Sequence, residues 1–206
     1  IVLTMPIVTV GLVNRTKSWW AGRRGPPVLQ SAWDLLRLLH KRPVVGDVAG
    51  PIFRAGPWVV LGATLVASMI APILGAVSPV SFERDVVAFA YVLGLARFAL
   101  VLAALDTGSS FEGMGAAREV SFTAFVEPAL FLLLGTAVVL TGRTSFAGAI
   151  GGWSWDGAGP WLAPVVAGVL FVALQAEASR VPVDDPLTHL ELTMIHEVMV
   201  LDHSGP

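Results

Sequence analysis

The sequence predicts an all-α integral membrane protein, a multi-span transmembrane helix bundle with a cytoplasmic amphipathic helix. The chain of 206 residues is 55% hydrophobic and only 14% charged, whereas an average soluble domain carries about 25% charged residues. Four apolar runs are long enough to cross the hydrocarbon core of a bilayer, which takes about 20 residues. All seven tryptophans lie in predicted loops or at the ends of predicted spans, as in the interfacial aromatic belt of membrane proteins.

The predicted spans begin with an incomplete one. Residues 1–13 are apolar but too short to cross the bilayer, and no signal-peptide cleavage site follows them. We therefore interpret this segment as the remnant of a first transmembrane helix and expect a longer natural protein, the more so because Gly205 and Pro206 end the chain in mid-loop. Four complete spans are predicted at residues 58–77, 86–105, 122–140 and 161–178.

The charges of the loops predict which side of the membrane each loop occupies. Residues 14–57 carry eight of the thirteen Lys and Arg side chains, so the positive-inside rule places this loop in the cytoplasm. Alternation along the chain then assigns the remaining loops. Residues 78–85 and 141–160 are expected outside, and residues 106–121 and 179–206 in the cytoplasm.

A short amphipathic helix is predicted within the basic loop. In residues 28–40, VLQSAWDLLRLLH, apolar side chains recur at helical spacing, with Asp34, Arg37 and His40 between them. Such a helix lies along the cytoplasmic membrane face. Packing against other loops is the alternative explanation of the same pattern.

Three ionisable residues fall within or at the edge of the spans, namely Arg97, Glu127 and Glu177. An unpaired charge at the centre of a bilayer costs about 2.5–3.5 kcal/mol on insertion scales, so such residues face a protein interior and often mark proton or ion paths. A static pair between Arg97 and one of the glutamates is the competing interpretation. Since Pro128 follows Glu127, we expect a broken or kinked helix start there.

The sequence predicts no metal or cofactor held by this chain. Cysteine is absent, which excludes disulfides, thiolate zinc sites and cysteine-ligated iron–sulfur clusters in this polypeptide. His189, His196 and His203 are spaced by seven, so on a straight helix neighbours lie about 10.5 Å apart and cannot share one metal. The basic side chains next to the membrane indicate topology and contact with anionic lipid, and no nucleic-acid partner is expected.

Three segments together resemble one family, and the resemblance covers essentially the whole chain. They are NRTKSWWAGRRGPPVLQSAWDLLRLLHK at residues 14–41, GMGAAREVSFTAFVEP at residues 113–128, and EASRVPVDDPLTHLELTMIHEVMVLDHSG at residues 177–205. The family is the membrane subunit shared by respiratory complex I, where it is subunit 1 (the H subunit in bacteria), and the group 4 NiFe hydrogenases. Its hydrogenase branch includes the formate hydrogenlyase subunit 4 and hydrogenase-4 component C types.

Details of the third segment favour the hydrogenase branch. The complex I branch has additional glutamates where Leu187 and His189 stand here, while Glu191 is kept. The run THLELTMIHEVMVLDHSG, together with LDTGSSFEGMG and GRRGPPVLQ, resembles the hydrogenase branch instead. In complex I this loop shapes the quinone chamber, a role that a proton-reducing hydrogenase does not need.

The resemblance implies a partial copy of an eight-helix fold and a subunit that is not catalytic by itself. It would anchor hydrophilic large and small subunits that carry NiFe and iron–sulfur centres in the cell's inner membrane, and connect them with antiporter-like membrane subunits. The implied coupling residues are Glu127 and Glu177 on the proton path, Arg118 at its cytoplasmic entrance, and Arg180, Asp184, Asp185 and Glu191 in the acidic loop. Arg97 is added to these as a buried charge on the residue pattern alone.

Three other functions fit the same composition. The first is a quinone-site subunit of a complex I-type dehydrogenase. The second is an independent secondary ion transporter, which would carry ion flux without partners. The third is a purely structural anchor whose buried charges pair statically.

Overall fold

The computed structural model is helical and confirms the predicted fold class. It describes residues 4–42, 44–46, 48–73, 75, 77–154, 156–157, 159–177 and 195–203, without the side chains of Glu177, His196 and Glu197. The described residues contain eight α-helices, of which four are long and apolar enough to span a membrane. The chain divides into two compact units, the second of which comprises residues 46–202.

The first unit contains α1 (Thr4–Trp20) and α2 (Gln30–Leu39), which pack on each other. The turn before α2 lies so close to α1 that a Cβ at Gly11 would overlap the carbonyl oxygen of Val28. α2 occupies the residues of the predicted amphipathic helix, and none of its side chains is buried. Its apolar face is therefore available for a membrane surface or another protein.

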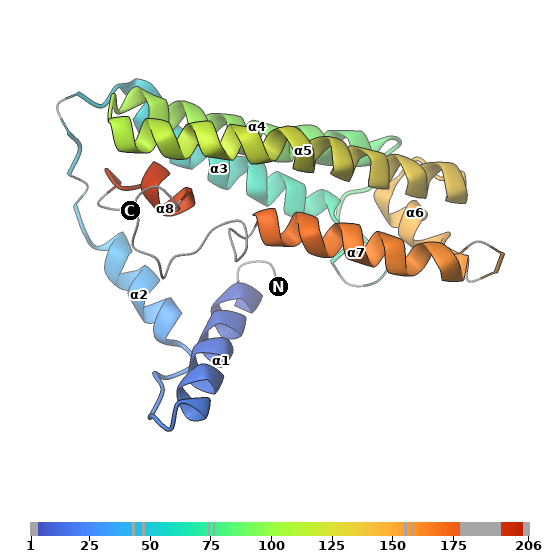
Figure 1. The fold of residues 1–206 in the computed structure, drawn as a ribbon, viewed down its shortest axis with the longest axis horizontal. Helices are drawn as coiled ribbons and strands as arrows, with labels where there is room; N and C mark the ends of the chain where they lie inside the picture. Colours follow the sequence, from blue (N-terminus) through green and yellow to red (C-terminus); the bar gives the residue numbers. More distant parts are fainter. Residues whose placement is uncertain are drawn as a thin grey trace. The chain divides into compact units, whose positions relative to one another are not determined.

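The second unit is built on three long helices that lie side by side, α3, α4 and α5 (Figure 1). α4 packs along both neighbours, and α5 also contacts the three later helices. The bounds of the six helices are α3 (Pro51–Ile70), α4 (Asp85–Asp106), α5 (Ser110–Thr141), α6 (Phe146–Gly151), α7 (Gly159–Glu177) and α8 (His196–Met199).

Small residues allow α3 and α4 to approach closely. A Cβ at Gly56 of α3 would lie 2.6 Å from the Cβ of Ala103 on α4. Ala63 and Ala67 of α3, and Ala96 of α4, are also buried. Membrane helices commonly pack through such small residues, because lipid tails leave no hydrophobic drive for larger side chains to associate.

Two aspartates at the ends of α4 join it to other segments. Asp106 accepts a hydrogen bond from the backbone N–H of Phe53, 2.9 Å away, at the start of α3. At the other end Asp85 is fully buried and accepts from the Ser81 hydroxyl (3.1 Å) and from the backbone N–H of Phe146 in the first turn of α6. These carboxylates satisfy helix-start N–H groups that would otherwise lack partners.

The starts of α3 and α5 differ from the starts of the predicted spans. α3 runs from Pro51 to Ile70, whereas the hydropathy pattern placed a span at 58–77. Proline at the first helical turn and the Asp106 cap start this helix early. α5 begins at Ser110, so most of the predicted loop 106–121 is helical and continuous with the predicted span 122–140.

The predicted break of the helix at Pro128 is wrong. Pro128 lies inside α5, which runs without interruption from Ser110 to Thr141, 32 residues in all. Membrane helices tolerate proline because neighbouring groups and local adjustments satisfy the freed carbonyl.

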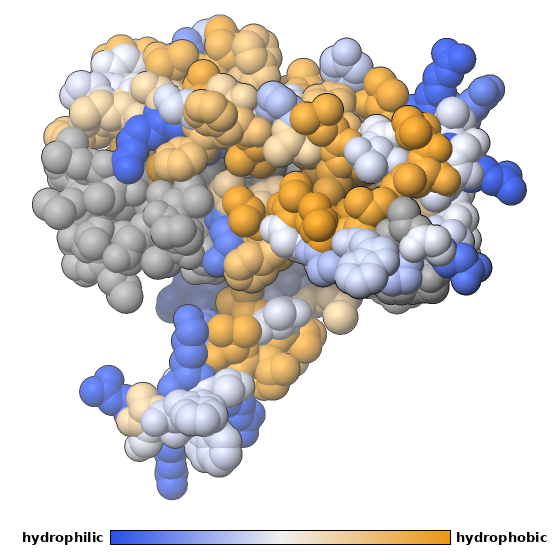
Figure 2. Space-filling model, turned by 45° about the vertical axis from the view of Figure 1, so that its right-hand side comes forward, coloured by the Kyte–Doolittle hydropathy of each residue, from blue (hydrophilic) through white to orange (hydrophobic). Residues whose placement is uncertain are grey.

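The surface of the molecule is apolar over wide areas, as Figure 2 shows for one face. Within the most apolar 18-residue windows of the spans, 22% of α3 and of α4 is buried, 6% of α5 and none of α7. Phe125, Leu132 and Val139 on α5 each expose more than 70% of their surface. Surface of this kind must be covered by lipid or by other membrane subunits.

Replacing Asp85 with alanine should destabilise the second unit. The substitution leaves the half-buried N–H of Phe146 without its acceptor and empties the buried site of Asp85, which costs about 1–3 kcal/mol. Thermal and chemical unfolding of the detergent-solubilised chain would measure this change. The exposed neighbour Glu83 is the control, since E83A should leave the unfolding free energy unchanged; equal effects of the two substitutions would contradict the structural role of Asp85.

Candidate functional site

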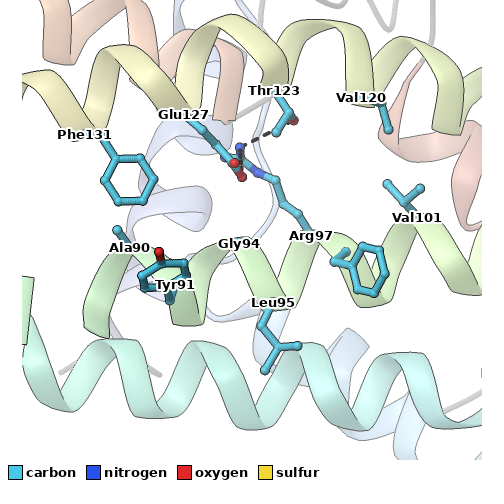
Figure 3. Close-up of a pocket in the computed structure, with 11 residues that line it drawn as sticks. Ala90, Tyr91, Gly94, Leu95, Arg97, Val101, Val120, Thr123, Glu127 and Phe131 are labelled. Atoms are coloured by element: carbon cyan, nitrogen blue, oxygen red, sulfur yellow. Dashed lines mark hydrogen bonds and ion pairs between the residues drawn. The ribbon is translucent and has the colours of Figure 1, made fainter. Parts of the chain in front are cut away.

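Polar side chains of α5 face α4 at the middle of the unit. Glu119, Thr123 and Glu127 are spaced by four residues on α5, and residues at this spacing share one face of a helix. Arg97 of α4 extends toward Thr123 and Glu127 (Figure 3), and it also lies near Glu119. The helix periodicity therefore places two carboxylates and a hydroxyl around a single guanidinium group.

Arg97 contacts all three groups. Its Nη1 donates to Glu127 Oε1 at 3.3 Å and lies 3.5 Å from Thr123 Oγ1. Its Nε lies 3.7 Å from Glu119 Oε1. Thr123 Oγ1 is also 3.4 Å from Glu119 Oε1, within reach to donate to it. One cation is thus shared between two carboxylates that lie two helical turns apart, with Thr123 between them.

The two carboxylates differ in their exposure. The Glu119 side chain is 8% exposed, whereas Glu127 is 35% exposed and Arg97 16%. Glu127 opens into a groove of about 490 Å³ between α4 and α5 (Figure 3). Tyr91 and Phe131, whose rings are 6.2 Å apart, line this groove beside Glu127. Glu127 is therefore the member of the cluster that is most accessible from outside the chain.

The cluster brings one guanidinium group to two carboxylates on adjacent helices. Ionisable groups at depth in membrane proteins normally pair with one another, and such pairs often lie on proton or ion paths.

Two of the predicted residues meet in this cluster. Arg97 and Glu127, singled out from the spans, form an ion pair, which is the arrangement that the static interpretation also anticipated. The sequence analysis missed Glu119 because it fell in the predicted loop 106–121. Its position eight residues before Glu127 was the available signal, since two helical turns separate groups on one face.

The other predicted site residues are not joined to this cluster by any described contact. Arg118 is on α5 and half-buried, and its Nη1 is buried without a hydrogen-bond partner among the described residues. The side chain of Glu177 lies outside the described part of the chain. So do His189 and the coupling residues of the acidic loop, Arg180, Asp184, Asp185 and Glu191.

Within the described residues, no group of three or more histidine, aspartate or glutamate side chains is arranged to hold a metal ion. The polar residues that do gather are two carboxylates, a hydroxyl and a guanidinium. A positively charged arginine in the centre repels a divalent cation, so this donor set fits protons better than metals.

Comparison with known proteins identifies relatives along the full chain. The profile of the family described as NADH dehydrogenase matches residues 1–205. Hydrogenase-4 component C of Escherichia coli K12 is 35% identical over 144 residues, covering 70% of this chain and 46% of that protein. Formate hydrogenlyase subunit 4 of the same organism is 34% identical over 66% of this chain and 45% of its own length. The chain thus spans about half the length of these relatives.

A more distant relative and a solved structure extend the comparison. The H subunit of NADH-quinone oxidoreductase from Rickettsia prowazekii is 26% identical over 188 residues, 85% of this chain and 54% of that protein. A chain in the structure of an archaeal membrane-bound sulfane sulfur reductase, a respiratory membrane complex, superposes with a TM-score of 0.73 at 21% identity, over 95% of this chain and 67% of that one. This likeness shows a shared fold. The four apolar helices, together with the relatives from membrane complexes, show that the chain is a membrane protein.

Arg97 and Glu127 should show energetic coupling. The single substitutions R97Q and E127Q each remove the pair, so the second should cost little once the first is made, with a coupling energy on the order of 1 kcal/mol. A double-mutant cycle on unfolding of the full-length chain in detergent or bicelles would measure it. R97Q combined with E83Q, a change at an exposed loop residue, should be additive. Additivity in the first pair would show that the contact contributes nothing.

Proposed function

Because this chain belongs to the NADH dehydrogenase family, we propose that it is the membrane-anchor and ion-coupling subunit of a membrane-bound NiFe hydrogenase complex. In this role it links a hydrophilic redox arm to proton or ion translocation and is not catalytic by itself. The proposal reaches beyond the chain, which spans about half the length of its relatives.

The observation that carries this proposal is the shared position of Arg97 between Glu119 and Glu127. A single cation between two carboxylates allows two arrangements, one with the guanidinium closer to each acid. In this proposal a redox reaction in the partner subunits shifts the guanidinium between them and so drives ion movement. Coupling of this kind requires a bistable element whose equilibrium is biased by a distant site.

The hydrogenase assignment is supported by the degree of similarity. The two hydrogenase-complex relatives are 35% and 34% identical to the chain, whereas the NADH-quinone oxidoreductase relative from Rickettsia prowazekii is 26% identical. The sequence pattern around Leu187 and His189 points in the same direction. In this proposal NiFe and iron–sulfur centres belong to partner subunits, the large and small hydrophilic subunits, and antiporter-like subunits lie beside the chain in the membrane.

The remaining residues take the roles that the resemblance implies. The proposed location is the inner membrane, with residues 14–57, 106–121 and 179–206 on the cytoplasmic side. Glu127 and Glu177 lie on the proton path, Arg118 stands at its cytoplasmic entrance, and Arg180, Asp184, Asp185 and Glu191 couple the acidic segment to the redox arm. Arg97 and Glu119, which are added from the geometry and not from the resemblance, hold Glu127 in the ion-paired cluster.

A quinone-site subunit is the second candidate. The similarity to the NADH-quinone oxidoreductase relative favours it, as does an apolar groove of about 600 Å³ between α4, α5, α6 and α7, which is wide enough for an isoprenoid-like chain. In this case the purified complex would reduce quinone in place of protons.

The identity of co-purifying subunits separates the two candidates. We expect the full-length chain, tagged and isolated from its native membrane in mild detergent, to bring down a large subunit with two CxxC pairs for NiFe ligation. Hydrogen evolution by the isolated complex, measured with a low-potential electron donor, would accompany it. A complex that reduces quinone and contains no nickel would instead support the quinone-site candidate.

Replacing Glu127 with glutamine should separate electron transfer from ion movement. E127Q keeps the shape of the side chain and a hydrogen-bond acceptor for Arg97 but removes the exchangeable proton. We expect hydrogen evolution within about twofold of the unmodified complex, and a loss of ion translocation by roughly tenfold or more. Inside-out vesicles with a pH-sensitive or sodium-sensitive dye would report translocation.

The control for this experiment is E83Q, which also removes one negative charge but lies in an exposed loop. It should leave both activities unchanged. Unaltered translocation by E127Q would favour a structural anchor with static pairs, and ion flux from the chain reconstituted alone would favour an independent transporter.

A further inference from the structure

A third carboxylate of α5, Glu112, is completely buried at the start of the helix. Its Oε1 accepts a hydrogen bond from the backbone N–H of Asp202 at 2.9 Å. Its Oε2 is also buried and has no hydrogen-bond partner among the described residues. One carboxyl oxygen of Glu112 therefore accepts a hydrogen bond, and the other has no partner among the described residues. Neither oxygen is accessible to solvent.

The short helix α8 closes this site. Ile195, Val198 and Met199 expose 2% of their surface or less, and Ile195 and Met199 pack with Ala104 and Ala116 in one apolar cluster. The approach to α5 is close, since a Cβ at Gly115 would lie 3.0 Å from the carbonyl oxygen of Ile195. α8 thus covers the first turns of α5 and keeps water away from Glu112.

Anchoring α8 does not by itself require a carboxyl group. A neutral glutamine would accept the same Asp202 N–H, whereas an ionised carboxylate without water costs several kcal/mol even after relaxation. The hydrogen bond from one N–H and the position in the first turn of α5 offset only part of that cost. The property that a glutamine at this position would lack is the ability to exchange a proton.

Glu112 is aligned with the cluster around Arg97. Glu119 follows it by seven residues and Glu127 by fifteen, so at 100° per residue the three carboxylates fall within about 80° of one another around the helix. At a rise of 1.5 Å per residue, the steps between them are about 10.5 and 12 Å. The three form a row along one face of α5, with steps that water molecules must bridge.

We propose that Glu112 is the outermost proton-exchanging carboxyl of this row, and that α8 is the lid that controls its access to water. When α8 lifts and admits water, Oε2 takes a proton from a hydronium ion and leaves a water molecule, and the new O–H bond breaks again when the proton passes through water to a carboxylate oxygen of Glu119. The net step moves one proton and no electron. This inference rests on the proposed ion-coupling function and extends its path to the start of α5.

The test uses the full-length chain in its complex, with E112Q and E112A. E112Q keeps the acceptor for Asp202 but cannot exchange a proton, so we expect α8 to stay seated and translocation per hydrogen evolved to fall by roughly tenfold or more. E112A removes both the acceptor for the Asp202 N–H and the exchangeable proton. Because the chain has no cysteine, a disulfide between cysteines introduced at Ala116 and Met199 reports whether α8 is seated.

The outcomes separate this inference from the function it rests on. Native translocation by E112Q, with E127Q inactive in the same vesicles, would overturn the role of Glu112 and leave the proposed function standing. Translocation at the native rate by both E112Q and E127Q would overturn the role of Glu112 and also the proposed function. Loss of translocation together with loss of the disulfide in E112Q would show that Glu112 is only an anchor. Loss of translocation with the disulfide intact is the result that supports the proposal.

Discussion

The sharing of Arg97 between Glu119 and Glu127 is the interaction on which the rest of this structure depends. Charged groups are costly among apolar helices unless they are paired, so this contact requires α4 and α5 to lie side by side at one register. Small residues let α3 approach α4, and the aspartates at the two ends of α4 bind the starts of α3 and α6, so α4 is held within the unit on its other sides as well.

The cluster joins one cation on α4 to two carboxylates on α5. Because α5 is continuous, the same helix also carries Glu112 beneath α8 and Glu127 beside the groove. One rigid element thus places buried and groove-facing carboxylates at fixed distances from one another.

The hydropathy pattern identified the charged residues whose neighbours in the sequence are apolar. It missed the two carboxylates that precede Glu127 on the same helix. Arg97 and Glu127 stood out because their neighbours are apolar. Glu119 and Glu112 were hidden because the polar stretch before residue 122 looked like a loop, although α5 begins at Ser110. The helix continues there because α4 and α8 pack on it and cover its polar groups, and such tertiary support outweighs local composition.

The sequence by itself determined the membrane class, the four apolar spans, the family resemblance and the identity of the charges at depth, because hydropathy and motifs are local properties of the chain. Only the tertiary structure decided where α3 begins, how far α5 extends, which carboxylates share Arg97 and what covers Glu112. Each of these depends on groups far apart in sequence, such as Arg97 with Glu127 or Glu112 with Asp202. The free energy of burying a charge depends on the partner that folding brings to it, and no local pattern contains that partner.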